Sequence, residues 1–179
     1  MIVGRLTWPW TAAACVVSAV GVSAALQTNA RTTAKASVSA HVARWVDGDT
    51  LHVTIAGHDV VVRLLGAGAP ETRPTAACGA AAATRLARRV LPVGSPVRVT
   101  TDKASGAVQD AFGRRLGYVD GGGDDVGERL IATGRATVYR FDGRHFSRLR
   151  RYESAQRAAR AARRGSWRHC PRFGHARRR

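Results

Sequence analysis

The sequence predicts an α+β fold in which five short strands alternate with three helices. Runs rich in β-branched residues recur along the chain and are separated by turn residues, which is typical of strands. Alanine-rich or leucine-containing stretches with helical spacing interrupt these runs. The chain has 179 residues, and beyond an N-terminal targeting stretch it has room for one domain of about 130 residues.

The domain is expected to begin near His41 with an antiparallel meander. β-rich runs cover Val42–Val46, Leu51–Ile55 and Val60–Leu65. Residues 56–59, Ala-Gly-His-Asp, join the last two runs with a link of hairpin length.

A helix over Ala76–Val90 should follow, because this stretch is rich in alanine and has apolar residues at helical spacing. Pro92 and Gly94 would end this helix. Strand character resumes at Val97–Thr101 and returns at Leu116–Val119.

The C-terminal part is predicted to hold two further helices. Val126–Thr133 is a short helix with Gly134 at its C′ position, and Ala136–Phe141 is extended. Ser147–Arg164 is a long helix that Gly165 caps. Its apolar side would carry Leu149, Tyr152, Ala155 or Gln156, and Ala159. Five strands with interposed helices suit an OB-fold-like small barrel as well as another α+β arrangement.

The N-terminal segment indicates export. Residues 6–26 carry no charge, and no acidic residue precedes Asp47. We expect residues 1–30 to be a signal peptide or a membrane anchor, since roughly 20 apolar residues can span a bilayer if they are not cleaved. We favour cleavage. Residues 31–40 read as a flexible linker, so the domain at 41–170 would be secreted or extracytoplasmic, or tethered through residues 6–26.

Two cysteines, Cys78 and Cys170, lie in the part that would be exported. An even number of cysteines outside the reducing cytoplasm predicts a disulfide, and two free thiols are the alternative. Such a bridge would tie the last element back to the first helix. Closing so long a loop would stabilise the fold by roughly 4 to 5 kcal/mol in the chain-entropy model.

The charge balance favours a polyanionic partner. Lys and Arg number 29 against 12 Asp and Glu, which gives a formal net charge of +17. The positive charge gathers in residues 148–164 and in the basic C-terminal tail, residues 171–179. The competing explanation for so much arginine is biased genome composition.

Three short motifs carry residues that could act on phosphodiesters. Val46-Asp47-Gly48-Asp49-Thr50 places two carboxylates around a glycine at a strand junction, where they could bind a hard cation such as Ca²⁺. Taken alone, an Asp-Gly pair is more often just a tight turn.

The second motif joins Arg63, on the third strand, to Glu71, just beyond the next glycine-rich bend. Phosphodiester hydrolysis needs a base that activates water and guanidinium groups that neutralise charge on the phosphoryl oxygens. Arginine suits the second task because its planar fork binds two oxygens at once. The alternative is a structural ion pair between Arg63 and Glu71.

The third motif is Asp110-Ala111-Phe112-Gly113-Arg114. It sets an aromatic ring and an arginine around a glycine turn, which could stack a base and clamp its phosphate. Turn chemistry explains the same residues equally well.

The order of the motifs is more specific than any one of them. The first three motifs are Asp-Gly-Asp-Thr at 47–50, Arg-Leu-Leu at 63–65 and Ala-Pro-Glu-Thr at 69–72. Asp-x-x-Gly-Arg at 110–114 and Arg-Arg-Gly-Ser-Trp at 163–167 follow. Over residues 42–170 the chain resembles the thermonuclease, or staphylococcal nuclease, family.

The resemblance implies an OB-fold, five-stranded β-barrel with three helices. It also implies Ca²⁺-dependent hydrolysis of DNA and RNA to 3′-phosphorylated products. We expect such an endonuclease to act as a monomer.

The resemblance also implies roles for individual residues. Asp49 matches the family's metal-binding aspartate, and Ala69 stands where a residue offers its backbone carbonyl to the metal. Glu71 matches the proposed general base. Arg63 and Arg114 match the two arginines that bind the scissile phosphate and stabilise the transition state.

Four more residues would support these groups. Asp47 is the neighbouring acid that shapes the turn, and Thr50 completes that motif. Phe112 sits where the family often has a tyrosine at the nucleotide pocket, and Tyr139 falls near another such tyrosine. Phe112 keeps the stacking surface but lacks the phenolic hydrogen bond.

The sequence departs from the family at Gly68, where the pattern expects a second metal-binding aspartate. The loss of one of two anionic ligands should weaken Ca²⁺ binding. A nuclease with a weakened metal site is therefore one hypothesis. A non-catalytic OB-fold module that binds nucleic acid is the second, and a protein whose basic helix at 148–164 meets anionic lipid is the third.

Overall fold

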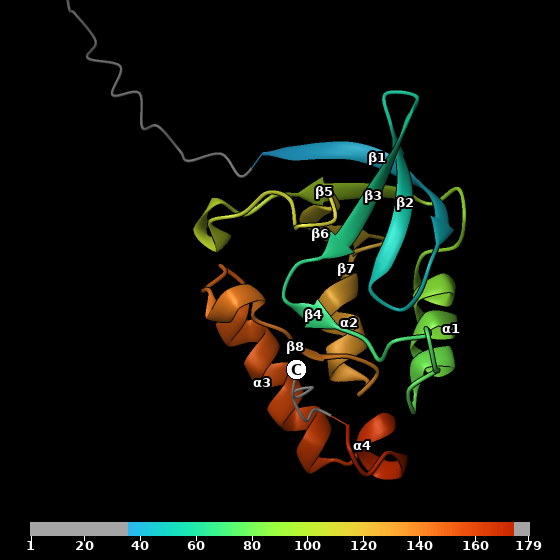
Figure 1. The fold of residues 1–179 in the computed structure, drawn as a ribbon, viewed down its shortest axis with the longest axis vertical. Coiled ribbons are helices and arrows are strands. Elements are labelled where there is room, and N and C mark those ends of the chain that lie inside the picture. Colours follow the sequence, from blue (N-terminus) through green and yellow to red (C-terminus); the bar gives the residue numbers. More distant parts are fainter. Residues whose placement is uncertain (1–35, 174–179) are drawn as a thin grey trace, which may run out of the picture. The chain divides into compact units, whose positions relative to one another are not determined.

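The computed structural model describes residues 36–173, and five of its strands close into a mixed β-barrel (Figure 1). The strands are β1 (Ser37–Trp45), β2 (Thr50–Ile55), β3 (His58–Leu64), β4 (Ala67–Gly68), β5 (Pro96–Thr100), β6 (Arg115–Gly121), β7 (Asp124–Asp125) and β8 (Thr137–Val138). The α-helices are α1 (Ala80–Val90), α2 (Val126–Ala132), α3 (Leu149–Ala161) and α4 (Ser166–His169).

One parallel pairing closes the barrel. The main sheet runs β3-β2-β1-β5-β6-β7, and its neighbouring strands pair antiparallel. β3 also pairs with β6 in parallel, with Val62 opposite Arg115 and Arg63 opposite Leu116. Because this contact joins both sides of the sheet, the closed α+β barrel of the OB-fold type is confirmed over the open α+β alternatives.

The hairpin between β2 and β3 is fixed by its turn. Ile55 pairs with His58, which leaves Ala56 and Gly57 as the two loop residues. Both have positive φ, 48° and 83° respectively. This is the type I′ pattern, whose twist matches that of the flanking strands. The turn sets the register that carries Arg63 to its place opposite Thr50.

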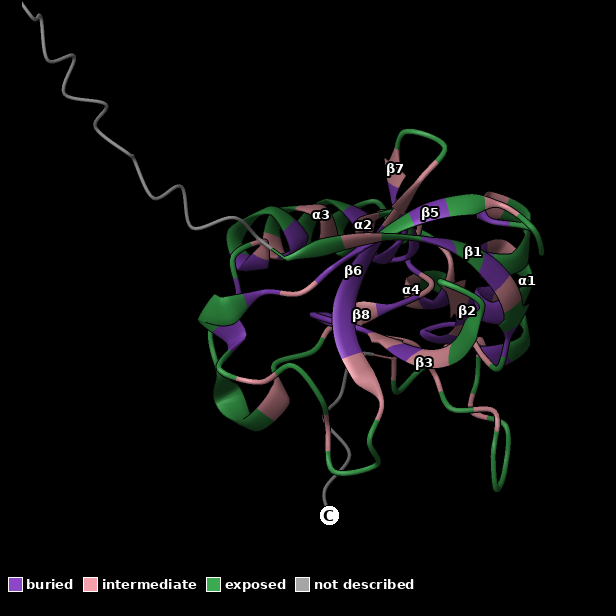
Figure 2. Ribbon diagram, turned by 90° about the horizontal axis from the view of Figure 1, so that it is seen from above, coloured by how far each residue is buried: buried purple, intermediate pink, exposed green. Residues whose placement is uncertain are grey.

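Alternate residues of the strands fill the barrel interior. Leu51, Val53, Val62, Val99 and Val119 have no exposed surface, and Figure 2 shows β6 as buried over much of its length. Each such side chain contributes roughly 1.5–3 kcal/mol through burial. Side chains therefore fill the barrel interior.

The helices cover one end of the barrel. α2 packs against α3, α1 and β6, and α1 also contacts β1, so α2 lies between α1 and α3 (Figure 1). Gly134 stands at the C′ position of α2 with a φ of 67°, as predicted. The apolar side of α3 is also as predicted, with Leu149, Tyr152 and Ala159 buried.

Two predicted boundaries near the N-terminal half were wrong. β1 begins at Ser37 and pairs with β5 from that residue onward, so residues 37–40 are strand and not linker. The first helix begins at Ala80, not at Ala76, because Gly79 is left-handed with a φ of 90°. Alanine content alone could not show that break.

The end of the long helix was also placed wrongly. α3 ends at Ala161, and Arg163 takes the left-handed conformation with a φ of 48°. Gly165 does not cap α3, because it is the N-cap residue of the short helix α4. In the stretch 136–141, only Thr137 and Val138 are strand.

Cys78 and Cys170 form a disulfide, with their Cα atoms 5.7 Å apart and a sequence separation of 92. The bridge ties the segment before α1 to the residue after α4. The predicted pairing is thus present in the structure.

Several predictions fall outside the described residues. These are the signal peptide or anchor at 1–30, the linker as far as residue 35, and the tail beyond residue 173. Within residues 36–173, no helix has the length and apolar character needed to cross a bilayer.

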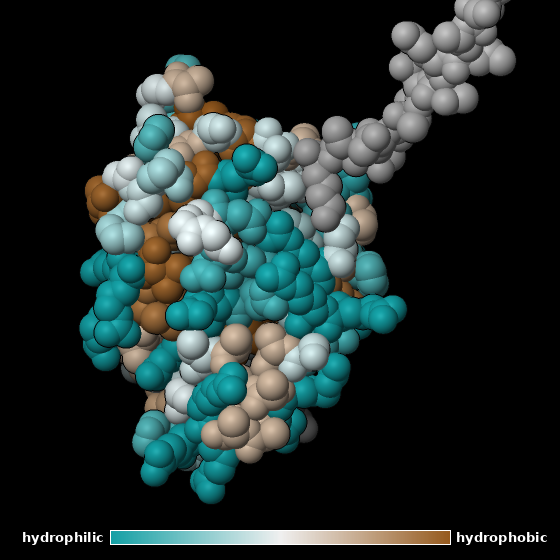
Figure 3. All heavy atoms as spheres, turned by 180° about the vertical axis from the view of Figure 1, so that it is seen from behind, coloured by the Kyte–Doolittle hydropathy of each residue, from teal (hydrophilic) through white to brown (hydrophobic). Residues whose placement is uncertain are grey.

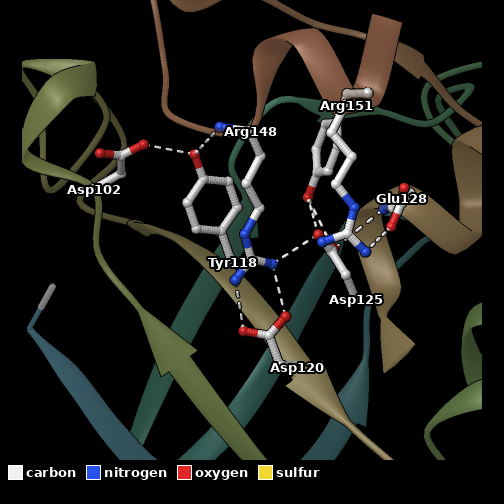
Figure 4. A network of polar contacts seen from close by, with 8 residues as sticks. Asp102, Tyr118, Asp120, Asp125, Glu128, Arg148 and Arg151 are labelled. Carbon is white, nitrogen blue, oxygen red and sulfur yellow. Dashed lines mark hydrogen bonds and ion pairs between the residues drawn. The ribbon is translucent and has the colours of Figure 1, made fainter. Parts of the chain in front are cut away.

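A partly buried ionic network attaches α3 to the barrel (Figure 4). The Arg148 guanidinium pairs with both carboxylate oxygens of Asp120, at 2.6 and 2.9 Å, and with Asp125 Oδ2 at 2.7 Å. It also lies 4.1 Å from the ring centroid of Tyr118. Asp125 accepts a hydrogen bond from the Tyr152 hydroxyl at 2.8 Å and caps α2.

The network is expected to contribute strongly to stability. Arg148→Ala should lower the free energy of unfolding by about 3–5 kcal/mol, because the carboxylate of Asp125, 3% exposed, would lose its cation. Urea denaturation measures this loss. The control is Arg151→Ala, whose side chain is 58% exposed and should contribute less than about 1 kcal/mol. Equal losses in the two variants would show that the buried pair has no special role.

Candidate active site

The site begins at a tight turn between β1 and β2. Asp47 Oδ1 accepts hydrogen bonds from the backbone N–H groups of Asp49, at 3.0 Å, and Thr50, at 2.8 Å. Such an Asx turn fixes the backbone through Asp47 and does not use the carboxylate of Asp49. Asp47 therefore shapes the turn, and Asp49 is left to point elsewhere.

Gly48 lets this turn lie close to two other segments. A Cβ atom at this position would lie 2.7 Å from the Cβ of Ala69 and 2.8 Å from the Cβ of Ala83 on α1. No other residue fits between them without displacing backbone. The contact packs the turn against the residue that follows β4.

Asp49 is buried, with 5% of its surface exposed, and donors surround its carboxylate. Arg63 Nη2 lies 3.1 Å from Oδ2, and the Ala69 N–H donates to the same oxygen. The Thr50 hydroxyl donates to Oδ1 at 3.1 Å. Three segments that are distant in the sequence thus meet at one carboxylate.

Burial raises the pKa of Asp49 to about 7, with the nearby Asp47 charge acting in the same direction and Arg63 opposing both. One cationic neighbour does not fully offset the cost of removing the charged carboxylate from water. Asp49 is therefore poised to gain from a second cation.

Arg63 is held in a fixed orientation. Its Nη1 donates to the backbone carbonyls of Ala67, at 2.6 Å, and Leu64, at 3.1 Å, while Nη2 faces Asp49. The side chain is 14% exposed. Its carboxylate partner is Asp49 and not Glu71, so the structural ion pair with Glu71 that the sequence left open is not formed.

The pairing of β4 with β8 brings Tyr139 to the same place. Gly68 pairs with Thr137, and the Tyr139 N–H donates to Gly66 O at 3.0 Å. Arg63 lies 5.7 Å from the centroid of the Tyr139 ring, which is 45% exposed. An aromatic surface for a base thus stands beside the arginine that could bind its phosphate.

Arg114 and Phe112 lie on the loop that precedes β6. Asp110 Oδ2 accepts a hydrogen bond from Arg114 Nε at 2.7 Å, and Oδ1 accepts the N–H of Phe112 at 3.0 Å. Arg114 lies 5.2 Å from the centroid of the Phe112 ring, which is 83% exposed. This pair forms its own cluster, one residue before the strand that pairs with β3.

Glu71 is exposed, and its side chain has no hydrogen bond or ion pair with any residue of the described chain. Its carbonyl accepts the Ala77 N–H at 2.9 Å, just before the disulfide at Cys78. The backbone at the proposed base is therefore anchored, while its carboxylate is open to solvent.

The residues present supply only part of a calcium site. Within residues 36–173, no group of three or more His, Cys, Asp or Glu side chains could surround a metal ion. Asp49 offers one carboxylate, and Gly68 has no side chain that could supply a second. Since Ca²⁺ takes six to eight oxygen ligands, these residues fit a weak site that water and substrate phosphate must complete.

One contributor to the site could not be found from the sequence. The carbonyl of Ala67 fixes the Arg63 guanidinium, but a backbone group leaves no trace in residue type. Only the pairing of β4 with β8 shows that this segment is held in place.

A family model described as staphylococcal nuclease homologue matches residues 61–169, which is more than half of the chain. The matched range holds Arg63, Glu71, Arg114 and Tyr139, while Asp49 precedes it. No curated protein matches the chain.

The raised pKa of Asp49 predicts a pH-dependent stability. Because its folded pKa of about 7 exceeds the unfolded value of about 3.9, the folded state binds the extra proton and loses stability as the pH rises from 4 to 7. Asp49→Asn removes this titration. The free energy of unfolding of the variant, relative to that of the parent, should therefore rise by on the order of 4 kcal/mol from pH 4 to pH 7.

Urea denaturation at several pH values, with a chelator present, measures both proteins. A difference between variant and parent that stays constant from pH 4 to pH 8 would contradict the assignment.

Proposed function

Because the chain belongs to the staphylococcal nuclease homologue family, we propose that it is a nuclease that hydrolyses the phosphodiester bonds of DNA and RNA. The observation that carries this proposal is the fixed Arg63 guanidinium beside the exposed Tyr139 ring. A rigid guanidinium next to a stacking surface suits a phosphate and its attached base.

The proposed chemistry divides among the chain's own residues. Arg63 and Arg114 bind the scissile phosphate and offset the charge that grows on its oxygens in the transition state. Glu71, whose carboxylate faces solvent, takes a proton from the attacking water. Asp49 and the Ala69 carbonyl would hold Ca²⁺, which when bound supplies Lewis-acid polarisation of the phosphoryl group.

Phe112 and Tyr139 are proposed to stack on the bases that flank the scissile bond. Both rings are exposed, and each lies within cation–π distance of one of the two arginines. Each arginine is thus paired with an aromatic ring.

Removal of the base or the fixed arginine should abolish most of the activity. Glu71→Gln and Arg63→Ala are each expected to lower kcat on denatured DNA by about 10²- to 10⁴-fold. The control is Glu153→Gln on α3, which removes the same charge from a residue with no role in the site. A parent protein that leaves DNA intact with Ca²⁺, Mn²⁺ and Mg²⁺ would end the enzyme proposal.

The substitution Gly68→Asp should strengthen the metal site. Its backbone does not need positive φ, but its Cβ would lie 3.1 Å from Tyr139 Cβ, so the side chain requires Tyr139 to shift by a few tenths of an ångström. Ca²⁺ affinity, measured by titration calorimetry, should rise because a second carboxylate joins Asp49. Unchanged affinity would show that Gly68 does not limit the site.

The second candidate is an OB-fold module that binds nucleic acid without cutting it. It is favoured by the absence, within residues 36–173, of any group of three or more His, Cys, Asp or Glu side chains that could hold a metal ion. This candidate requires that the protein bind nucleic acid without metal, and that the affinity fall steeply as the salt concentration rises. Metal-free binding together with no cleavage would establish it.

We also propose that the protein works outside the cytoplasm, either secreted or tethered. The disulfide between Cys78 and Cys170 supports this, together with the uncharged stretch at residues 6–26. Both cysteines should resist alkylation without reductant in protein isolated from its own cells, as measured by mass spectrometry. Alkylation of both in the folded protein would contradict the proposal.

A further inference from the structure

A groove of about 400 Å³ lies between α1 and two segments of the candidate active site. One wall begins at the residue before Asp47, and another begins at the residue after Glu71. Its lining residues include Val46, Thr72, Arg73, Thr84, Arg85 and Arg88. The groove thus adjoins the site through direct chain neighbours.

The groove is strongly positive. Arg73, Arg85 and Arg88 are all exposed, and no acidic residue lines it. All 12 acidic residues of the chain lie at or after Asp47, within the described part. None of them forms an ion pair with these three arginines.

The three arginines converge because of the fold. Arg85 and Arg88 are three residues apart on α1, so they share one face of the helix. Arg88 Nη2 lies 3.4 Å from the carbonyl of Trp45, which directs it toward the end of β1. Arg73 approaches from the segment that Glu71 begins.

The chemistry of the groove suits phosphodiester groups. Guanidinium forks bind phosphate oxygens in pairs, the Thr72 hydroxyl adds a donor, and Val46, 46% exposed, offers an apolar surface to a sugar. We infer that this groove binds the backbone phosphates of the same polynucleotide strand, a few nucleotides from the scissile bond. This inference rests on the proposed function.

The spacing agrees with such a path. Arg73 follows Glu71 by two residues, which limits the separation of their Cα atoms to about 7 Å. Phosphates along one strand of B-DNA advance by about 3.4 Å per nucleotide. A strand held at the site therefore reaches the groove within a short length.

The test compares two double variants that remove equal charge. Arg73→Gln with Arg85→Gln changes the groove at residues whose side chains make no hydrogen bond in the described chain. Arg89→Gln with Arg157→Gln is the control, because both arginines are exposed and neither lines the groove. Circular dichroism and Tm establish that all variants fold.

Fluorescence anisotropy with a chelator present measures binding of labelled single-stranded DNA of about 12 nucleotides and of a dinucleotide. The groove variant should bind the longer strand about tenfold more weakly. Its slope of log affinity against log salt should fall by about 1.4, since two contacts contribute about 0.7 each. Dinucleotide binding should not change, and the control variant should resemble the parent.

Equal weakening in both double variants would reduce the effect to overall charge and overturn the inference. Unchanged binding of the long strand by the groove variant would also overturn the inference. A groove variant that loses binding to phosphatidylglycerol vesicles but still binds DNA like the parent would overturn it too. If the parent cleaves DNA with Ca²⁺ while the groove variant binds like the parent, only the groove inference fails. If the parent neither binds nor cleaves DNA, the proposed function fails with it.

Discussion

The buried carboxylate of Asp49 is the constraint on which the candidate site depends. It holds the turn after β1, the Arg63 guanidinium on β3 and the backbone after β4 in one cluster. Because an unpaired charge at this depth would be costly, the three segments must stay together. Arg63 is therefore oriented before any substrate arrives, which reduces the entropy lost when a phosphate binds.

The closure of the barrel places the rest of the site around this cluster. The parallel pairing of β3 with β6 brings the loop that carries Arg114 next to the strand that carries Arg63. On the side opposite to Figure 1, Figure 3 shows hydrophilic side chains over much of the surface, next to a band of hydrophobic ones. One barrel thus fixes the arginines, while the Arg148 network fixes α3 independently.

Most of the fold could be predicted from the sequence because runs of β-branched residues indicated the strands, the resemblance to the nuclease family implied the barrel, and the number of cysteines indicated the disulfide. The boundaries that failed depended on backbone conformation, as at Gly79, or on pairing between distant segments, as at residues 37–40. For the candidate site, residue types indicated Asp49, Arg63 and Arg114. They could not show that Asp49, and not Glu71, is the partner of Arg63, since that choice depends on three-dimensional proximity.

We propose that Asp49, as the one metal-binding carboxylate, supports metal-dependent cleavage of nucleic acid together with Arg63, Arg114 and the base Glu71. The most direct test is the rate at which the unmodified protein cleaves denatured DNA as Ca²⁺ is varied. We expect no cleavage in a chelator, and activity that rises with Ca²⁺ and saturates only at high concentration, because the site lacks a second carboxylate. Full activity in the chelator, or saturation at trace Ca²⁺, would contradict this proposal.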